Sequence, residues 1–408
     1  MPSNPPAGDP MPPSGELPER ALQELGRRPF GFYVHVPFCV TRCGYCDFNT
    51  YTDLGGMQGS YAGTVIAEIE LARRVLGHHE LKLQTVFFGG GTPTLLPARD
   101  LGRILQALQD NFGLAAGVEV TTEANPESVD EHYLAALRAE GFTRVSFGMQ
   151  SAVPHVLATL DRVHEPGRPQ QCVQWARDAG FEQVSLDLIY GTPGESAQDW
   201  QRSIDSALGT QPDHISAYAL IVEEGTRLAG QVSRRELAMP DDDDLADKYL
   251  QADESIAAAG LDWYEVSNWS RPGGECRHNL GYWRGSDWWG AGPGAHSHAG
   301  GVRWWNLRHP SAYAAAVEAG RSPGQAREVL TDDDRRTERI LLETRLSTGI
   351  DPAVLVPQAR RALPHLVADG LLSAAGTSYV LTQRGRLLAD LVVRALVVTS
   401  DHSPVPSH

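Results

Sequence analysis

Strand-like and helix-like segments alternate along most of this chain of 408 residues. Six short runs rich in β-branched and aromatic residues, which are typical of buried strands, recur from residue 30 onward: FGFYVHV, TVFFGG, VEVTTEAN, RVSFGMQ, QVSLDLIYG and HISAYALIV. Segments such as YAGTVIAEIELARRVL and ARDLGRILQALQDNF separate them and carry apolar residues three and four positions apart. Repeated strand–helix units predict a parallel sheet with right-handed crossovers, either open or closed into a barrel.

Residues suited to chemistry follow successive predicted strands. Three cysteines follow the first strand, residues 89–92 follow the second, and Glu123, Gln150 and Asp187 lie at the ends of the next three. In a barrel the carboxyl ends of the strands converge on one face, whereas an open sheet would spread these groups along a line. We therefore predict an α/β fold in which a partial (β/α)6 barrel carries its site at the carboxyl ends of the strands.

The chain should divide into a tail and two domains. Residues 1–29 are rich in Pro, Gly, Ser and charge without a periodic apolar face, so we expect a disordered tail. The barrel domain should occupy residues 30–329, although its pattern weakens past residue 224 into acidic, Trp-rich and Gly-rich segments. Residues 330–400 follow the order helix, two short strands, helix, which predicts a small α+β winged-helix-like domain with a packing or lid role.

Charge and hydropathy exclude several classes of partner. The 51 acidic and 35 basic residues give a net charge of -16, which argues against attraction to nucleic acid or anionic lipid. No apolar run approaches the roughly 18 residues that a membrane crossing needs, and the first residues lack the pattern of a signal peptide. We expect a cytoplasmic protein with no nucleic-acid partner and no transmembrane segment.

The five cysteines are Cys39, Cys43, Cys46, Cys172 and Cys276, and the first three lie in the eight-residue segment CVTRCGYC. An odd number with one tight cluster indicates thiolate metal ligation in a reducing compartment rather than a disulfide framework. Three thiolates satisfy three irons of a cubane and leave the fourth open to a small ligand. A zinc site or free thiols are the alternatives, but no neighbouring residue completes a four-ligand zinc set.

The CxxxCxxC loop after a first strand, with an aromatic residue at Tyr45, resembles that of the radical S-adenosylmethionine (SAM) superfamily. Together, YVHVPFC, FFGGGTPT, TTEANPESV, SFGMQS, LDRVH and LDLIYGTPGE resemble the oxygen-independent coproporphyrinogen III oxidase group across most of residues 30–225. The resemblance implies a [4Fe-4S] cluster on Cys39, Cys43 and Cys46, whose open iron chelates the amine and carboxylate of SAM. FFGGGTPT corresponds to a glycine motif that lets the backbone approach the methionine end of that ligand.

By position, the resemblance assigns nine residues to the SAM region: Tyr33, Tyr45, Gly90, Gly91, Thr92, Glu123, Gln150, Arg162 and Asp187. The carboxylates of Glu123 and Asp187 suit ribose hydroxyls or the ligand amine, and the guanidinium of Arg162 suits a carboxylate. The alternative for each charged residue is a solvated ion pair at the barrel mouth.

One position separates two branches of this group. The oxidase carries a further cysteine two positions after the third, where this chain has Phe48 in CDFNTY. This departure, with the HNxxYW pattern in HNLGYW, resembles instead the HemW branch of haem chaperones. The resemblance implies a haem site made by His278, Asn279, Tyr282 and Trp283, in an extension of the barrel over about residues 225–310.

The residue chemistry is compatible with haem. An imidazole can ligate haem iron, and flat apolar surface for a porphyrin could come from Tyr282, Trp283, Trp288 and Trp289. Two alternatives remain: a buried histidine with tryptophans in the core, or a zinc site made by Cys276, His278, His296 and His298.

The sequence thus predicts a haem chaperone that transfers haem to an acceptor haemoprotein and carries a [4Fe-4S] cluster and SAM. An electron donor such as a flavodoxin or ferredoxin is a candidate partner. The alternative function is oxygen-independent coproporphyrinogen III oxidase, an enzyme of porphyrin biosynthesis, and a passive scaffold is the third. Because the extra cysteine is missing, enzymatic activity stays an open question at this stage.

Overall fold

The computed structural model describes residues 8–53, 55–162, 165 and 167–397. The chain divides into two compact units. The first comprises the residues up to 262 together with 267–281 and 286–329, and the second comprises 263–266, 282–285 and the residues from 330 onward.

Six parallel strands form the centre of the first unit: β2 (Phe30–Val36), β3 (Leu83–Gly90), β4 (Leu114–Ala124), β5 (Arg144–Gln150), β6 (Gln183–Tyr190) and β7 (His214–Ala219). The helices between them are α2 (Gln58–Leu76), α3 (Ala98–Phe112), α4 (Glu131–Ala139), α5 (Pro154–Thr159), α6 (Arg168–Asp178) and α7 (Ala197–Leu208). This alternation confirms the predicted α/β fold with a mostly parallel central sheet.

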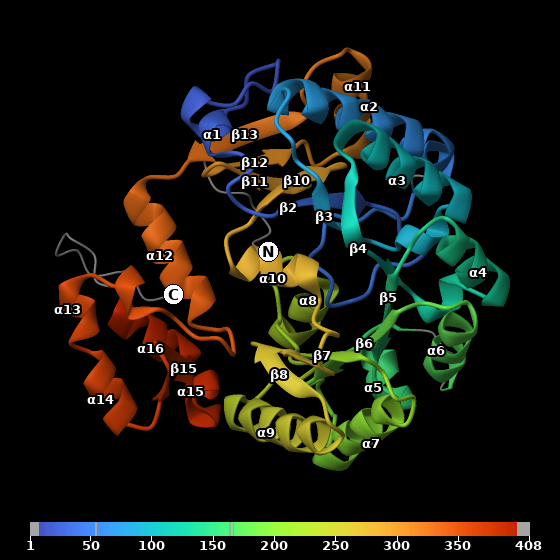
Figure 1. Ribbon diagram of the computed structural model, residues 1–408. Helices are drawn as coiled ribbons and strands as arrows, with labels where there is room; N and C mark the ends of the chain where they lie inside the picture. Colours follow the sequence, from blue (N-terminus) through green and yellow to red (C-terminus); the bar gives the residue numbers. More distant parts are fainter. Residues whose placement is uncertain (1–7, 54, 163–164, 166, 398–408) are drawn as a thin grey trace. The chain divides into compact units, whose positions relative to one another are not determined.

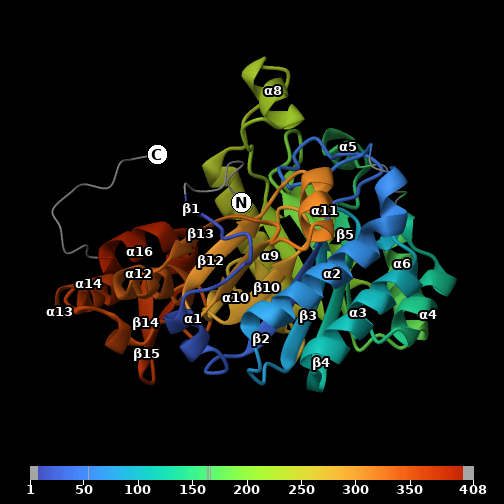
Figure 2. The same ribbon diagram turned by 90° about the horizontal axis from the view of Figure 1, so that it is seen from above.

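Burial on both faces explains why these sequences form this sheet. Six of the seven residues of β2 are buried, as expected for a parallel strand covered on both sides. On α3, Leu101, Ile104, Leu105 and Leu108 are buried at helical spacing. Figures 1 and 2 show α2, α3, α4 and α6 along the outer side of a curved row of strands. The inner side of this row is left for the polar residues that line the site.

The sheet continues beyond the six strands that the sequence predicted. On the β2 side it runs through β10 (Asp287–Ala291), β11 (His296–Ala299), β12 (Val302–Asn306), β13 (Gly324–Val329) and β1 (Asp9–Pro10), and on the β7 side it adds β9 (Asn268–Ser270). The remaining elements are α8 (Arg227–Ser233), α9 (Asp242–Ala258), α10 (Arg277–Trp283), α11 (Pro310–Glu318) and the short β8 (Asp262–Glu265). β10 pairs with β2 in parallel, so the chain after residue 224 is structured, although its local pattern is weak.

The expectation of a disordered tail over residues 1–29 is wrong for residues 8–29, and residues 1–7 lie outside the described part. β1 pairs with β13, and α1 (Glu19–Glu24) follows. Met11, Leu17, Ala21 and Leu25 are buried. These four side chains contribute enough apolar burial to order a segment whose composition is otherwise typical of disorder.

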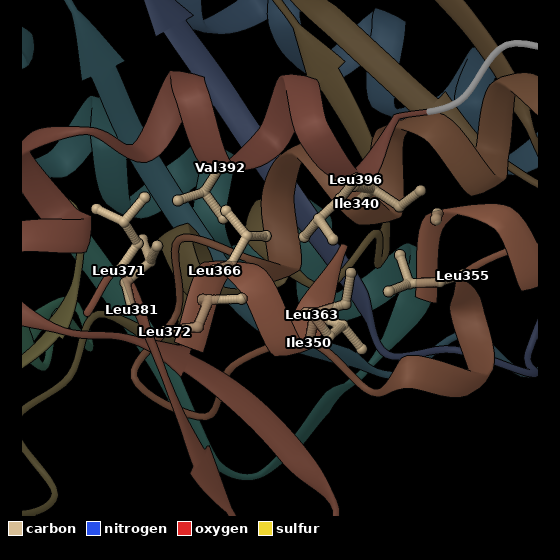
Figure 3. Packing of buried hydrophobic residues seen from close by; sticks show 11 residues of the cluster. Ile340, Ile350, Leu355, Leu363, Leu366, Leu371, Leu372, Leu381, Val392 and Leu396 are labelled. Carbon is tan, nitrogen blue, oxygen red and sulfur yellow. The ribbon is translucent and has the colours of Figure 1, made fainter. Parts of the chain in front are cut away.

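The second unit has a hydrophobic core of its own. Its elements are α12 (Asp332–Glu343), α13 (Pro357–Arg360), α14 (Leu363–Ala368), the hairpin of β14 (Leu372–Ala375) and β15 (Ser378–Leu381), α15 (Gln383–Leu387) and α16 (Ala389–Leu396). Figure 3 shows buried side chains of this unit pointing toward one another, among them Leu366 of α14, Val392 of α16 and Ile350 from the segment between α12 and α13. The order of helices and hairpin is that of the winged-helix-like pattern.

Among the described residues, none of the helices combines the length and the apolar composition that a membrane crossing requires.

A buried carboxyl group ties the helical layer to the extended edge of the sheet. Glu68 of α2 accepts hydrogen bonds from the Trp289 indole (3.4 Å), the Gly292 backbone amide (2.9 Å), the Asn306 amide (2.8 Å) and the Tyr313 hydroxyl. Such a buried carboxyl is stable only because these donors replace water. The four partners come from β10, the loop after it, β12 and α11.

We predict a stability difference between wild type and Glu68→Gln that depends on pH. Burial raises the pKa of Glu68 from 4.5 to about 7. As pH rises between these values the unfolded carboxyl ionises while the folded one keeps its proton, so wild-type stability falls, by about 3 kcal/mol in total. Gln does not ionise and should lack this slope. Urea unfolding of both cluster-free proteins from pH 5 to 8 measures it, and parallel curves would contradict the assignment.

Candidate functional site

The three clustered cysteines lie on a closed loop between β2 and α2. The Cys39 backbone amide donates to the Tyr51 carbonyl (3.0 Å), and the Tyr51 amide donates to the Pro37 carbonyl (2.8 Å), so both ends of the loop are tied together. Cys39, Cys43 and Cys46 are partly exposed. The loop therefore presents three thiols at the carboxyl end of β2.

These thiols fit a cluster better than a single metal ion. Among the described residues, no three His, Cys, Asp or Glu side chains surround one ion position. A cubane needs no such convergence, because each thiolate binds a different iron. Burial raises the pKa of Cys39, and raises that of Cys46 to about 11. The nearby Arg162 guanidinium, with Nη1 3.6 Å from Cys43 Sγ, supplies positive charge beside the thiols.

The glycine motif after β3 lies against the strand that leads to the cysteines. A Cβ on Gly90 (φ 110°) would lie 2.6 Å from the His35 ring, and one on Gly91 would lie 2.4 Å from the Phe38 carbonyl oxygen. The Gly91 and Thr92 amides donate to the carbonyls of Val36 and Phe38, both at 2.7 Å. The packing of the protein itself thus requires these glycines, in addition to any approach by a ligand.

Two acidic side chains meet inside the barrel. Glu123 of β4 accepts a hydrogen bond from the Gly90 amide (3.1 Å), and the Ser146 hydroxyl donates to the carboxylate of Asp187 on β6, whose two oxygens lie 3.0 and 3.1 Å from it. Burial, with the nearby charge of Asp187, raises the pKa of Glu123 to about 8. Burial also raises the pKa of Asp187, although hydrogen bonds from Ser216 and Ser146 oppose it. A ligand with several N–H or O–H donors would replace the missing water here.

Gln150 and Arg162 meet beside Gly148 at the end of β5. The pairing of β5 with β6 is irregular between Gly148 and Gln150, and Gln150 has a positive φ of 63°. Arg162 Nη2 donates to the Gly148 carbonyl (2.8 Å), and a Cβ on Gly148 would lie 2.8 Å from Gln150 Nε2. Arg162 thus links the end of β5 to the cysteine loop through Cys43.

The two tyrosines assigned to the SAM region differ in their surroundings. Tyr45, in the cysteine loop, packs on a cluster that includes Val156 and Leu228, and burial raises its pKa. The Tyr33 hydroxyl lies 3.0 Å from His35 Nδ1, and its ring stacks on Phe87 at 6.2 Å between centroids. Tyr33 is therefore part of the barrel interior as well as a neighbour of the glycine motif.

The HNxxYW pattern forms α10, which starts inside the barrel. The carboxylate of Glu119 on β4 accepts hydrogen bonds from the backbone amides of Arg277 and His278, both at 3.0 Å, and so caps the helix. The His278 Nδ1 lies 2.8 Å from Thr85 Oγ1, and its ring stacks on Phe87 at 5.2 Å. Figure 1 shows α10 on the inner side of the row of strands.

The cysteine loop and α10 lie at different levels of the barrel. His278 contacts Thr85 and Glu119, which pair with each other across β3 and β4. Gly89 and Glu123 lie four residues further along the same strands, or about 13 Å at the usual rise per residue. The two predicted sites are therefore separated along the barrel axis, which the sequence did not indicate.

Several residues proposed for a haem or zinc site contact other groups of the protein instead. Trp289 is buried against Trp304 at 4.9 Å, so it belongs to the core and is not a free porphyrin surface. The Cys276 thiol lies 3.7 Å from Glu119 Oε1, and His298 Nδ1 lies 3.1 Å from the Ser286 carbonyl. The other candidate residues are half-buried, namely Asn279, Tyr282, Trp283, Trp288 and His296. Tyr282 and Trp283 belong to the second unit.

Sequence reasoning missed four polar residues that hold these sites: His35, Asn49, Thr85 and Glu119. His35 lies in YVHVPFC and Asn49 in CDFNTY, so both stood inside the quoted motifs. Both could have been found from the sequence, because each is a polar residue next to a predicted strand end or to the predicted metal-binding loop. Thr85 and Glu119 gave no comparable signal, because only the tertiary fold brings them to α10.

Comparison with known proteins identifies related chains. A model of the Radical SAM superfamily matches residues 33–207. A Mycobacterium tuberculosis protein named heme chaperone HemW is 53% identical over 385 residues, covering 94% of this chain and 98% of that protein. An Escherichia coli protein of the same name is 31% identical over 376 residues, covering 88% and 96%.

A solved structure shares the fold. Coproporphyrinogen III oxidase from Escherichia coli, described as a radical SAM enzyme, superposes with a TM-score of 0.79 over 93% of each chain at 23% sequence identity. At this identity the similarity concerns the architecture and does not extend to the reaction.

We predict that anaerobic reconstitution yields about four irons per chain, as one cubane requires. Replacing Cys39, Cys43 and Cys46 by Ala together should abolish iron binding, because the two remaining thiols are buried elsewhere, Cys172 on α6 and Cys276 beside Glu119. The Cys172→Ala variant is the matched control, since this thiol is buried on α6, and it should keep the wild-type iron content. Iron analysis and absorption spectra measure both. A full cluster in the triple variant would refute the ligand assignment.

SAM affinity should depend on pH through Glu123. Donor groups of the ligand prefer the ionised carboxylate, whose fraction grows as pH rises toward and beyond a pKa of about 8. Affinity should therefore increase from pH 6.5 to 8.5 in wild type, and Glu123→Gln should lower it roughly 10- to 100-fold and flatten the profile. Calorimetry on the reconstituted proteins tests this. Equal profiles for the two proteins would place the ligand elsewhere.

Proposed function

Because this chain belongs to the HemW family of the radical SAM superfamily, we propose that it is a haem chaperone that binds haem and transfers it to an acceptor haemoprotein. The observation that carries the proposal is the 53% identity to a protein named heme chaperone, which extends over 94% of this chain. Such coverage includes the barrel, α10 and the second unit, so the likeness is not confined to the radical SAM core.

The superfamily implies a [4Fe-4S] cluster and SAM, and the chain has residues that fit both. Cys39, Cys43 and Cys46 would hold the cluster, with Arg162 beside Cys43. The buried carboxyl of Glu123 would receive donor groups of SAM near the Gly90 amide. When bound, the cluster supplies one-electron chemistry and an open iron for the SAM amine and carboxylate. The protein holds the loop closed and keeps bulk water from the acidic residues.

One substituted position weighs against the oxidase, which is the alternative function. Phe48 stands where the oxidase has its extra cysteine, and 53% of this residue is exposed. An exposed phenyl ring provides neither a thiolate nor a proton. We therefore propose that the fold shared with the oxidase is used here without oxidative decarboxylation of coproporphyrinogen.

His278 is our candidate for the axial haem ligand. Burial lowers its pKa to about 3, so the ring is neutral at pH 7, which is the form that ligates metals. The residue is only 3% exposed and stacks on Phe87. A porphyrin is much larger than an imidazole, so ligation requires the His278 ring to leave this stack.

The cellular context follows from the same chemistry. Free thiols of the cysteine loop and a reducible cluster belong in a reducing compartment, so we place the protein in the cytoplasm. An electron donor of the flavodoxin or ferredoxin class would keep the cluster reduced. The acceptor would be a haemoprotein.

The wild-type protein should bind haem and should not convert coproporphyrinogen III to protoporphyrinogen. Replacing His278 by Ala should shift the Soret band and weaken haem binding without abolishing it, because apolar contact supplies the rest of the affinity. The matched control is His214→Ala, since His214 is also buried in the barrel with Nδ1 on a hydroxyl, that of Ser185 at 2.7 Å. Haem titration followed by absorption measures all three proteins.

Two results would revise the proposal. An unchanged spectrum in the His278 variant with a changed one in Cys276→Ala would move the axial ligand to the thiolate. Efficient decarboxylation of coproporphyrinogen III by the reduced wild-type protein, measured by chromatography of the porphyrins, would favour the alternative function, the oxidase.

A further inference from the structure

Asn49 occupies the arm of the cysteine loop that returns to the barrel, three residues after Cys46. Its side-chain amide donates to two backbone carbonyls far away in the sequence, those of Pro293 (3.0 Å) and Arg308 (2.9 Å). Its Oδ1 accepts a hydrogen bond from the Tyr51 hydroxyl (3.2 Å), which lies at the same distance from the Arg308 carbonyl. All polar atoms of this side chain are thus engaged.

The two acceptors belong to a hydrogen-bonded backbone unit, which we call the acceptor turns (residues 292–295 and 306–308). The Gly294 backbone amide donates to the Leu307 carbonyl (3.0 Å), and the Asn306 backbone amide donates to the Ala295 carbonyl (2.9 Å). These two hydrogen bonds join the two turns. Gly294 has φ 76°, and a Cβ there would lie 2.6 Å from Asn49 Nδ2. The turns therefore pack closely around the Asn49 side-chain amide, and a residue larger than glycine at position 294 would clash with it.

The backbone of Asn49 is held from the opposite side by the barrel interior. His35 Nε2 lies 3.0 Å from the Asn49 carbonyl oxygen, and His35 Nδ1 lies 3.0 Å from the Tyr33 hydroxyl. A carbonyl only accepts, so Nε2 carries the proton of the neutral ring and Nδ1 accepts from Tyr33. Burial lowers the pKa of His35, which keeps the ring neutral. The tautomer is fixed by these two neighbours.

We propose that Asn49 is a positioning residue for the cluster, which clamps the cysteine loop between His35 and the acceptor turns. Only two residues separate Asn49 from Cys46, so the position of the Cys46 thiol follows that of Asn49. Asn49 is not a ligand and acts through the loop, as residues behind metal ligands commonly do. The inference concerns the cluster alone and does not depend on haem binding.

The clamp couples cluster binding to the order of the acceptor turns. If cluster binding holds the cysteine loop in place, it also holds Asn49, whose side-chain amide donates to two carbonyls of the acceptor turns. By linkage, an ordered set of turns favours the cluster to the same extent. Residues 292–308, which follow the haem pattern in the sequence, should therefore be better ordered when the cluster is bound.

The test compares full-length reconstituted wild type with Asn49→Asp. Asp keeps the shape but cannot donate to the carbonyls of Pro293 and Arg308, and it places negative charge against them. Iron release to a chelator under anaerobic conditions should be roughly tenfold faster in the variant. Hydrogen exchange of residues 292–308 should differ between cluster-loaded and cluster-free wild type, and this difference should be lost in Asn49→Asp.

Two further variants keep the test decisive. Asn111→Asp is the matched control, because the Asn111 amide donates to the Ala107 carbonyl (2.8 Å) on α3, far from the loop in the chain, and it should release iron at the wild-type rate. Tyr51→Phe removes one donor to the same site and should accelerate release by a smaller factor, even if Asn49→Asp fails to fold. Wild-type release rates in Asn49→Asp, or in Tyr51→Phe where the first variant does not fold, would overturn the proposal.

Discussion

Parallel pairing of β2 with β3, and of each following strand up to β7, brings the carboxyl ends of six strands to one edge of the sheet. Every loop that leaves a strand at this edge then faces the same space. The cysteine loop, the glycine motif and the acidic pair of Glu123 and Asp187 meet for this reason. Their burial in turn raises the pKa of both carboxyl groups, which prepares the space for a ligand rich in hydrogen-bond donors.

Local sequence signals predicted the features that depend on local structure. The six strands, their crossover helices and the cysteine loop follow from periodicity and spacing, and the structure contains them. The sheet beyond β2 was not predictable, because β10 joins it through pairing between residues about 250 positions apart, such as Asp287 with Phe30. The same holds for the segment with Met11 and Leu17, whose order depends on β13. The burial of His278 against Thr85 also depends on the tertiary fold, since nothing around HNLGYW indicates it.

Because α10 and the cysteine loop are separated along the barrel, the two regions suit different ligands. The mouth of the barrel has the thiols, glycines and carboxyl groups that suit a cluster and SAM, whereas the haem pattern starts deeper, capped by Glu119. The acceptor turns connect the two regions, because they follow α10 in the chain and bind Asn49 in the cysteine loop.

A haem chaperone hands haem to an acceptor instead of releasing it into solution. Haem-loaded, reconstituted protein mixed in a stopped-flow instrument with increasing concentrations of a b-type apo-haemoprotein separates these cases. For direct transfer we expect a rate that rises with acceptor concentration and exceeds the rate of spontaneous haem loss to excess apomyoglobin. A rate independent of the acceptor and equal to spontaneous loss would contradict it.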